Sequence, residues 1–106
     1  MKDCIFCKIA SGEIPSTKIV DEEKFFIIKD IHPKALKHFL LITKEHYALL
    51  ENQSEKQASE FGEILASIHK YEKILGIENG FSLRINQKAG GGQEIAHLHV
   101  HILADY

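Results

Sequence analysis

The segment 97–103, with the sequence HLHVHIL, constrains the fold more strongly than any other part of the chain. Its aliphatic residues alternate with three histidines, and a repeat of two residues is that of a β-strand with one apolar face. We therefore predict a strand that packs its leucine, valine and isoleucine side chains into a core. The opposite face of this strand would carry the histidines in a row, namely His97, His99 and His101.

Four further segments have the pattern of strands, and their order along the chain sets the fold class. No regular alternation of strand and helix connects them, so they favour an antiparallel sheet and the α+β class. With the histidine strand, the sheet would have about five strands. The largely apolar run 38–43 predicts a central strand covered on both faces. The four expected strands lie at 17–21, 24–29, 38–43 and 81–86.

One long helix is expected at 54–75. Ser54 and Gln57 have the spacing of a capping box, apolar residues then recur at helical intervals, and Gly76 is a natural end. The apolar stripe of this helix is interpreted as a core face rather than a binding groove. A short helix or turn is also expected before Gly12.

Size and charge exclude several classes of function. A chain of 106 residues has room for one core, so we expect a single domain over residues 1–106. The formal net charge is −2 and the lysines are spread along the sequence, which is not the pattern of a nucleic-acid or membrane-surface protein. The sequence shows no apolar leader and no run of membrane-span length, so a cytoplasmic protein is expected.

The three histidines of the predicted strand cannot share one metal ion. Side chains two residues apart on a strand face are separated by roughly 7 Å, so the outer two would lie roughly 13 Å apart. An ion with nitrogen ligands at about 2 Å could bridge neighbours but not all three. The row is therefore expected to divide its roles, which argues against a metal-storage protein. Glycines 90–92 precede the strand, and their backbone N–H groups could converge on a phosphate.

Cys4 and Cys7 form a C-x-x-C motif and are the only cysteines. A disulfide is not expected in a reducing compartment, and the strand context of a thioredoxin-like redox motif is missing. Two interpretations remain. The pair is half of a metal site that needs two more ligands, or it is two ordinary buried thiols.

The segment GGQEIAHLHVHIL resembles the signature of the histidine triad (HIT) family, in which histidines alternate with apolar residues after Gly-Gln. The segments CIFCKIASGEIP, KDIHP and HFLLITKEH resemble blocks of its nucleotide-binding Hint branch, in the same order and with similar spacing. The resemblance extends over nearly the whole chain. It implies a HIT-like fold.

The resemblance also implies roles for individual residues. His99 matches the nucleophile, which attacks the α-phosphorus of a nucleotide and forms a nucleotidyl-histidine that water hydrolyses. His101 matches the donor to the phosphate and leaving group, His38 an orienting histidine, and Asp30 the residue that binds the ribose hydroxyls. The matches around the phosphate are Asn86, Gly92, Gln93 and Glu94, and those around a purine are Phe6, Ile9, Ile28 and Ile31. For the apolar positions a plain core role is about as well supported. Glu94 replaces a serine of animal relatives, so it is expected to offer only its backbone N–H.

The same resemblance supplies the two missing metal ligands. Cys4, Cys7, His46 and His97 match the structural zinc site of several bacterial relatives, and Cys₂His₂ is a closed tetrahedral ligand set. His97 would then serve the metal rather than the reaction. No cofactor is expected to be required for catalysis itself.

The expected activity is that of a nucleotide hydrolase or transferase, above all a purine-nucleoside 5′-phosphoramidase. Its partners would be AMP or an adenosine phosphoramidate and, as the resemblance implies, a second copy of the chain in a homodimer. A dinucleoside-polyphosphate hydrolase is the alternative enzyme, and a non-catalytic nucleotide-binding regulatory module is the alternative class. Few cations are available near the loop for further phosphates, with only Arg84 and Lys88 in question. His32 and His69 are assigned no role.

Overall fold

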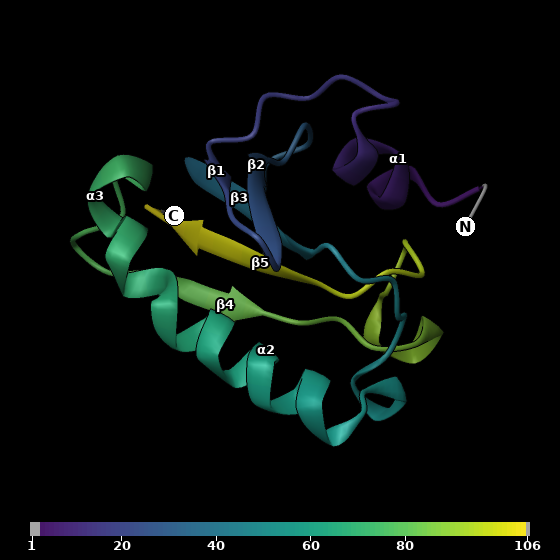
Figure 1. The fold of residues 1–106 in the computed structure, drawn as a ribbon. Helices are drawn as coiled ribbons and strands as arrows, with labels where there is room; N and C mark the ends of the chain where they lie inside the picture. The colour runs from purple at the N-terminus through teal and green to yellow at the C-terminus, as the bar shows by residue number, and fades with distance from the viewer. Residues whose placement is uncertain (1–2, 106) are drawn as a thin grey trace.

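The computed structural model describes residues 3–105. It contains one five-stranded antiparallel sheet with strand order β1-β2-β3-β5-β4, and helices lie on both of its sides (Figure 1). The α+β class and the antiparallel sheet are thus confirmed. The strands are β1 (Val20–Asp21), β2 (Phe25–Lys29), β3 (Lys37–Thr43), β4 (Ser82–Arg84) and β5 (His99–Ala104). The helices are α1 (Ile5–Ser11), α2 (Glu55–Ser67) and α3 (Glu72–Leu75), with 3₁₀ turns η1 (Leu50–Asn52), η2 (Ile68–Tyr71) and η3 (Ala89–Gly91).

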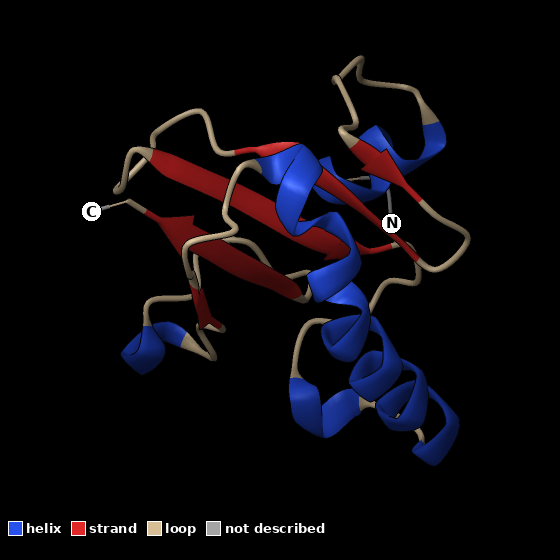
Figure 2. Cartoon of the chain, turned by 90° about the vertical axis from the view of Figure 1, so that its left-hand side faces the viewer, coloured by secondary structure: helices blue, strands red, loops and turns tan. Residues whose placement is uncertain are grey.

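The long helix forms as expected but is not a regular α-helix throughout. The Ser54 hydroxyl accepts the Gln57 N–H at 3.1 Å, and the Gln57 side chain accepts the Ser54 N–H at 2.9 Å, so the capping box is closed. The helical path then runs through α2, η2 and α3 to Gly76, which has a φ of 70°. The segment therefore begins and ends where the sequence places it, with a 3₁₀ interruption. Figure 2 shows this segment in front of the sheet.

The two faces of the sheet carry two separate apolar clusters. The aliphatic face of β5 packs with β3 and α2 in the larger cluster, which includes Leu41, Phe61, Ile64, Leu98, Val100 and Ile102. The opposite face carries a smaller cluster under α1, made of Phe6, Ile9, Phe26, Ile28 and Ile42. The central strand β3 is covered on both faces, as its continuous apolar pattern predicts. The histidine face of β5 is consequently not a plain polar surface, because α1 closes one end of it.

The predicted histidine strand begins two residues later than expected. β5 begins at His99, and the His97 N–H instead donates to the Ile95 carbonyl oxygen at 2.8 Å within a turn. His97 therefore lies just before the strand, although its ring meets Phe6 as the ring of His99 does, so the prediction is corrected only in where the strand begins. The physical reason is that alternating side chains show which residues share a face, whereas hydrogen bonding to β3 decides at which residue the strand begins. Among residues 3–105, no helix is both long and apolar enough to cross a bilayer.

Candidate functional site

Three histidines from two neighbouring strands share the sheet face that α1 partly covers. In the β3–β5 register, Ile42 lies opposite His99, Leu40 opposite His101, and His38 opposite Leu103. Directly opposed residues point to the same side of an antiparallel pair, so His38, His99 and His101 all project from this face. Antiparallel pairing thus joins residues that are 63 positions apart in the chain.

The ring of His99 is held in one tautomer by the backbone. Its Nδ1 lies 2.7 Å from the carbonyl oxygen of His97. A carbonyl oxygen can only accept, so Nδ1 carries the proton and Nε2 keeps a free lone pair. The ring is 7% exposed and meets the edge of Phe6 at a centroid distance of 5.1 Å. A neutral imidazole with a bare Nε2 is the form that acts as a nucleophile or base.

His38 and His101 form a second oriented pair beside it. The His38 Nδ1 accepts the Lys34 backbone N–H at 3.0 Å, so a neutral His38 carries its proton on Nε2. That Nε2 lies 2.9 Å from the His101 Nδ1 and 3.3 Å from a carboxylate oxygen of Asp30. When it donates to His101, the proton of that ring sits on Nε2. The pair then offers one outward N–H donor.

Burial keeps the rings of His38 and His101 neutral at physiological pH. It lowers the pKa of His101 to about 4, and the neighbouring histidines act in the same direction. Burial also lowers the pKa of His38, while the carboxylate of Asp30 opposes that shift. The tautomers assigned to His38 and His101 therefore describe their dominant state near pH 7.

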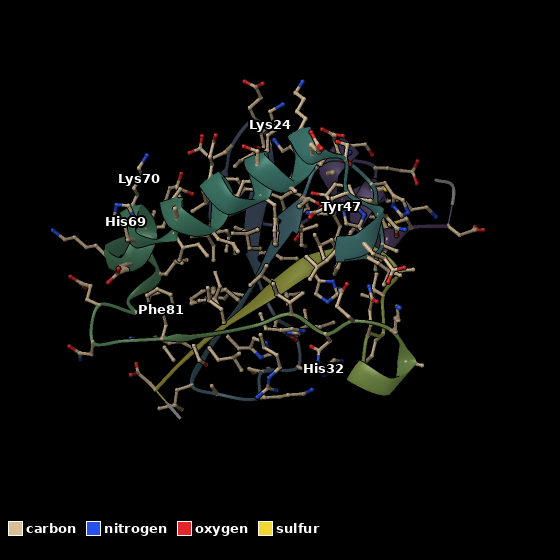
Figure 3. All side chains as sticks on the ribbon, turned by 90° about the horizontal axis from the view of Figure 1, so that it is seen from below. Lys24, His32, Tyr47, His69, Lys70 and Phe81 are labelled. Carbon is tan, nitrogen blue, oxygen red and sulfur yellow. The ribbon has the colours of Figure 1, made fainter. Side chains whose placement is uncertain are left out.

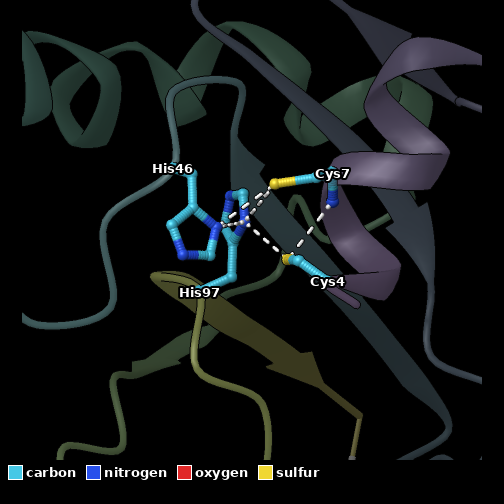
Figure 4. Close-up of side chains that lie close together, drawn as sticks. All are labelled: Cys4, Cys7, His46 and His97. Carbon is cyan, nitrogen blue, oxygen red and sulfur yellow. Dashed lines mark hydrogen bonds between the residues drawn. The ribbon is translucent and has the colours of Figure 1, made fainter. Parts of the chain in front are cut away.

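Cys4, Cys7, His46 and His97 converge at the start of α1 (Figure 4). The Cys4 Sγ lies 3.2 Å from the His97 Nδ1, and the Cys7 Sγ lies 3.2 Å from the His46 Nδ1. The His46 and His97 Nδ1 atoms are 3.1 Å apart, and the Cys7 Sγ is 3.6 Å from the His97 Nδ1. Four ligands around a tetrahedral zinc ion would be separated by about 3.3 to 3.8 Å. The observed spacing is therefore close to that of a compact tetrahedral site.

The protonation of His97 fits the same interpretation. Its Nε2 lies 2.6 Å from the Thr43 carbonyl oxygen and must carry the ring proton, so the bare Nδ1 faces the thiols. Burial lowers the pKa of His97, which keeps the ring neutral, and burial raises the pKa of the Cys7 thiol. A bound cation would favour the thiolate that burial alone disfavours. The donor set and its tautomer thus fit a metal ion such as zinc.

Asp30, His38 and His101 form another group with the spacing of metal ligands, but they do not fit a metal ion. The Lys34 N–H occupies the lone pair on the His38 Nδ1, which forces the ring proton onto the Nε2 that would have to bind. Metal binding there would require an imidazolate or the loss of this backbone hydrogen bond. Both groups contain two histidines, but the hydrogen bonds of these histidines differ. Only the cysteine-containing group has a histidine nitrogen, the Nδ1 of His97, left free to bind a metal ion.

The glycine loop is braced by side chains rather than left free. The Asn86 amide donates to the Gly91 carbonyl oxygen at 2.7 Å, and Gly92 has a φ of 80°. The Gln93 side chain accepts the Lys88 N–H at 2.9 Å and donates to the Ala48 carbonyl oxygen at 2.9 Å. Gln93 thus joins the loop to the chain after β3. Glu94 lines an open hollow beside Cys4 and His46.

The residues expected around a purine lie in two places. Phe6, Ile9 and Ile28 are buried together in the smaller cluster, whereas Ile31 is 85% exposed on the loop after β2. Asp30 accepts the His32 N–H at 2.8 Å on one carboxylate oxygen, while the other lies beside His38. His69 lies on the helical segment and His32 on the far side of the sheet, where Figure 3 labels them.

Two residues near the site carried no motif in the sequence. Thr43 fixes the ring of His97 and Lys34 fixes that of His38, both through backbone groups, which every residue type possesses. No pattern of side chains could have revealed them. The sequence did not show whether Arg84 faces the site. It lies directly opposite His101 in the β4–β5 pair, so its side chain projects from the same face. Lys88 instead forms an ion pair with Glu51 at 2.8 Å.

The fold and site together define a class of small α+β proteins whose last strand carries alternating histidines. The HIT domain description matches residues 11–106. Protein HitA of Neisseria gonorrhoeae is 39% identical over 103 residues, which cover 97% of this chain and 96% of HitA. The chain belongs to the HIT domain family.

Solved structures agree over the whole fold. A histidine triad protein from Clostridium difficile matches with a TM-score of 0.91 and 41% identity, covering 100% of this chain and 93% of that one. A HIT family hydrolase from Legionella pneumophila matches at 0.89 and 36%, with 98% and 94% covered. A Zn-bound histidine triad family protein from Mycobacterium smegmatis matches at 0.82 and 27%, with 99% and 76% covered.

Proposed function

We propose that this protein is a nucleotide hydrolase of the Hint-like type that cleaves purine-nucleoside 5′-phosphoramidates. The observation that carries the proposal is the fixed tautomer of His99, whose Nδ1 is held at 2.7 Å by the His97 carbonyl so that Nε2 is bare. The relative from Legionella pneumophila, described as a hydrolase, supports the reaction class. The substrate class rests on the family resemblance and on the small number of cations at the site.

In the proposed reaction the His99 Nε2 attacks the α-phosphorus and the P–N bond breaks. The amine leaves with that electron pair and takes up a proton from solvent, and the nucleotide remains bonded to Nε2. The Nδ1–H keeps its hydrogen bond to the carbonyl of His97, so the intermediate ring is cationic and is a good leaving group. Water then attacks phosphorus and loses a proton to solvent, and the P–Nε2 bond breaks, which releases AMP and restores the bare Nε2. His101 would donate its Nε2–H to a phosphoryl oxygen as charge develops there.

Nucleotide binding is assigned to the residues around these rings. The backbone N–H of Glu94 would meet the phosphate beside Gly92, whose own N–H donates to the Ala89 carbonyl oxygen at 3.0 Å, and Asn86 and Gln93 brace this loop. Asp30 would accept the ribose hydroxyls. The purine would lie against the apolar residues at the edge of the smaller cluster, Phe6, Ile9, Ile28 and the exposed Ile31.

The test is to mix the protein with an adenosine 5′-phosphoramidate and to follow AMP release. Mass spectrometry of the quenched mixture should show one added adenylyl group, located on the peptide that contains His99. Saturable nucleotide binding with neither AMP release nor an adduct would replace this proposal with that of a non-catalytic binding module.

A dinucleoside-polyphosphate hydrolase remains the second candidate, and one observation favours it. Arg84 lies directly opposite His101 and projects from the same face. A guanidinium there could contact a phosphate beyond the α position.

We further propose a structural zinc ion held by Cys4, Cys7, His46 and His97, with no step of the reaction assigned to it. Zinc would supply a closed tetrahedral link between α1 and the strands. The convergence of two thiols and two Nδ1 atoms supports it, as does the Zn-bound relative from Mycobacterium smegmatis. The chain is also proposed to act as one domain over residues 1–106, as a homodimer, in the cytoplasm.

A further inference from the structure

His97 links the metal-type cluster to the proposed nucleophile. Its ring contributes Nδ1 to the cluster with Cys4, Cys7 and His46, while its backbone carbonyl accepts the Nδ1–H of His99 at 2.7 Å. The side chain of His97 is fully buried. A shift of this residue therefore moves one of the cluster's four ligands and the anchor of His99 together.

In both His97 and His99 a backbone carbonyl accepts one ring N–H, but the nitrogen left without a proton differs between the two rings. The ring of His97 donates through Nε2 to the Thr43 carbonyl at 2.6 Å, so its Nδ1 is bare and faces the thiols. The ring of His99 donates through Nδ1 to the His97 carbonyl, so its Nε2 is bare. The first backbone bond prepares a metal ligand and the second prepares a nucleophile. The acceptor of the second hydrogen bond is the backbone carbonyl of His97, the residue whose ring makes the first. The anchor of the His99 ring therefore depends on where His97 is held.

A second path runs through α1. Cys4 and Cys7 flank Phe6, whose ring meets His97 at a centroid distance of 5.8 Å and His99 at 5.1 Å. Cys4 also caps α1, since its Sγ accepts the Cys7 N–H at 3.4 Å. Anchoring the two cysteines thus anchors the aromatic wall against which the His99 ring lies.

We propose that Cys4, Cys7, His46 and His97 are positioning residues for His99, so that divalent metal bound by them sets the tautomer and the reactivity of that ring. The catalytic part of this inference rests on the proposed function, whereas the structural part concerns only where the His99 proton sits. Cys4 and His46 line an open hollow with Asp3 and Glu94. Cys4 and His46 are thus reachable from solvent, and the two carboxylates favour an approaching cation.

The experiment compares the wild-type protein, stripped of metal by a chelator, with the same preparation reloaded with one equivalent of Zn²⁺. Nitrogen-15 NMR of the histidine rings reports which nitrogen of His99 carries the proton, and a His99→Gln sample assigns the signal. The loaded protein should show the Nδ1–H form alone. The stripped protein should show both forms, with kcat for an adenosine phosphoramidate reduced by roughly tenfold to a hundredfold, and reloading should reverse both changes.

Variants separate positioning from mere loss of folding. His46→Ala should behave as the stripped protein even with Zn²⁺ present. His46→Cys restores a four-ligand Cys₃His set and should regain metal, the Nδ1–H form and kcat. Lys8→Ala, on the same helix as Cys7 but outside the ligand set, is the matched control and should remain wild-type.

The outcomes also separate this inference from the proposed function. If the stripped protein keeps its circular dichroism spectrum and an unchanged Nδ1–H signal for His99, the positioning role is wrong, whatever the activity. A wild-type protein that takes up no Zn²⁺ would overturn it as well. If the tautomer responds to Zn²⁺ but no phosphoramidate is cleaved, positioning stands and the proposed substrate is wrong.

Discussion

Individual residues in this site are defined by backbone carbonyls and N–H groups as much as by one another. His97, His99 and His38 each bond one ring nitrogen to the main chain, at 2.6, 2.7 and 3.0 Å respectively. Each bond fixes a tautomer and so decides what the other ring nitrogen can do. Chemically identical side chains are thereby suited to the three different roles proposed for them, as metal ligand, nucleophile and hydrogen-bond donor.

Replacing His99 should abolish catalysis while leaving nucleotide binding measurable. We expect His99→Asn to lose several orders of magnitude in kcat, because no other bare ring nitrogen within residues 3–105 lies in its place. Asn is preferred to Ala because the ring is buried against Phe6. Quench-flow or endpoint assays of AMP release, with calorimetric AMP binding as the folding control, check this. Retention of more than about a tenth of wild-type kcat would contradict a covalent mechanism.

Substrate preference should favour phosphoramidates over polyphosphates. A polyphosphate needs positive charge beyond the α-phosphate. Arg84 projects beside His101 and the charge of Lys34 also acts on that ring, while Lys88 is paired with Glu51. An exposed guanidinium contributes little in water. We expect kcat/KM for an adenosine phosphoramidate to exceed that for diadenosine tetraphosphate by at least about a hundredfold, or about 2.7 kcal/mol.

Arg84→Gln should widen this ratio by lowering only the tetraphosphate activity, and Lys88→Gln is the matched control that should change neither value. Equal or reversed efficiencies in the wild-type protein would instead support the dinucleotide hydrolase. A loss of both activities in Arg84→Gln would place Arg84 at the α-phosphate.

At the scale of elements, α1 depends on distant anchors. It has seven residues, too few to be stable alone, and it buries only Phe6 and Ile9 in the smaller cluster. Two of the proposed metal ligands, Cys4 and Cys7, lie at its beginning, and the other two come from the chain after β3 and before β5. The proposed metal site would therefore fasten α1 to the sheet.

Metal removal should consequently loosen α1 before the rest of the protein. Elemental analysis of protein purified without chelators should give about one zinc per chain, and stripping it should lower the Tm. Hydrogen exchange should show early loss of protection in 5–11 but not in α2, which has its own capping box. Protein that contains no bound metal of any kind would remove the site.

At the scale of the whole molecule, buried neutral histidines link stability to pH. Burial lowers the pKa of His101 to about 4, below the ordinary value for histidine of about 6.5. Between these values the unfolded chain binds more protons, so the free energy of unfolding should fall as the pH drops from about 6.5 to about 4. Burial of His38 and His97 acts in the same direction.

Urea unfolding of metal-free protein across this pH range measures the slope. His101→Gln should reduce it, while His69→Gln, a change at an exposed histidine, should leave it as it is. An unaltered slope in His101→Gln would mean that the folded protein does not hold that ring neutral.

The sheet ends in an exposed edge that predicts self-association. β4 is an edge strand, its three residues are exposed, and the apolar Leu83 is 42% exposed on it. Unpaired strand edges with apolar side chains are sites of association, and a two-fold axis there would join two sheets. We expect sedimentation at micromolar concentration to show a dimer and Leu83→Glu to shift it towards monomer. Monomer alone in the wild-type protein would contradict the dimer.

The sequence by itself determined the local elements. Alternation in 97–103, the capping box at Ser54 and the C-x-x-C motif are short-range patterns, and strand and helix periodicities are read from neighbours in the chain. The tertiary structure decided which groups meet. Strand register brought His38 to His101, moved His97 out of the strand, and aimed the Thr43 and His97 carbonyls at imidazoles. Every residue has a carbonyl, so only the three-dimensional path of the chain could select the ones that fix these tautomers.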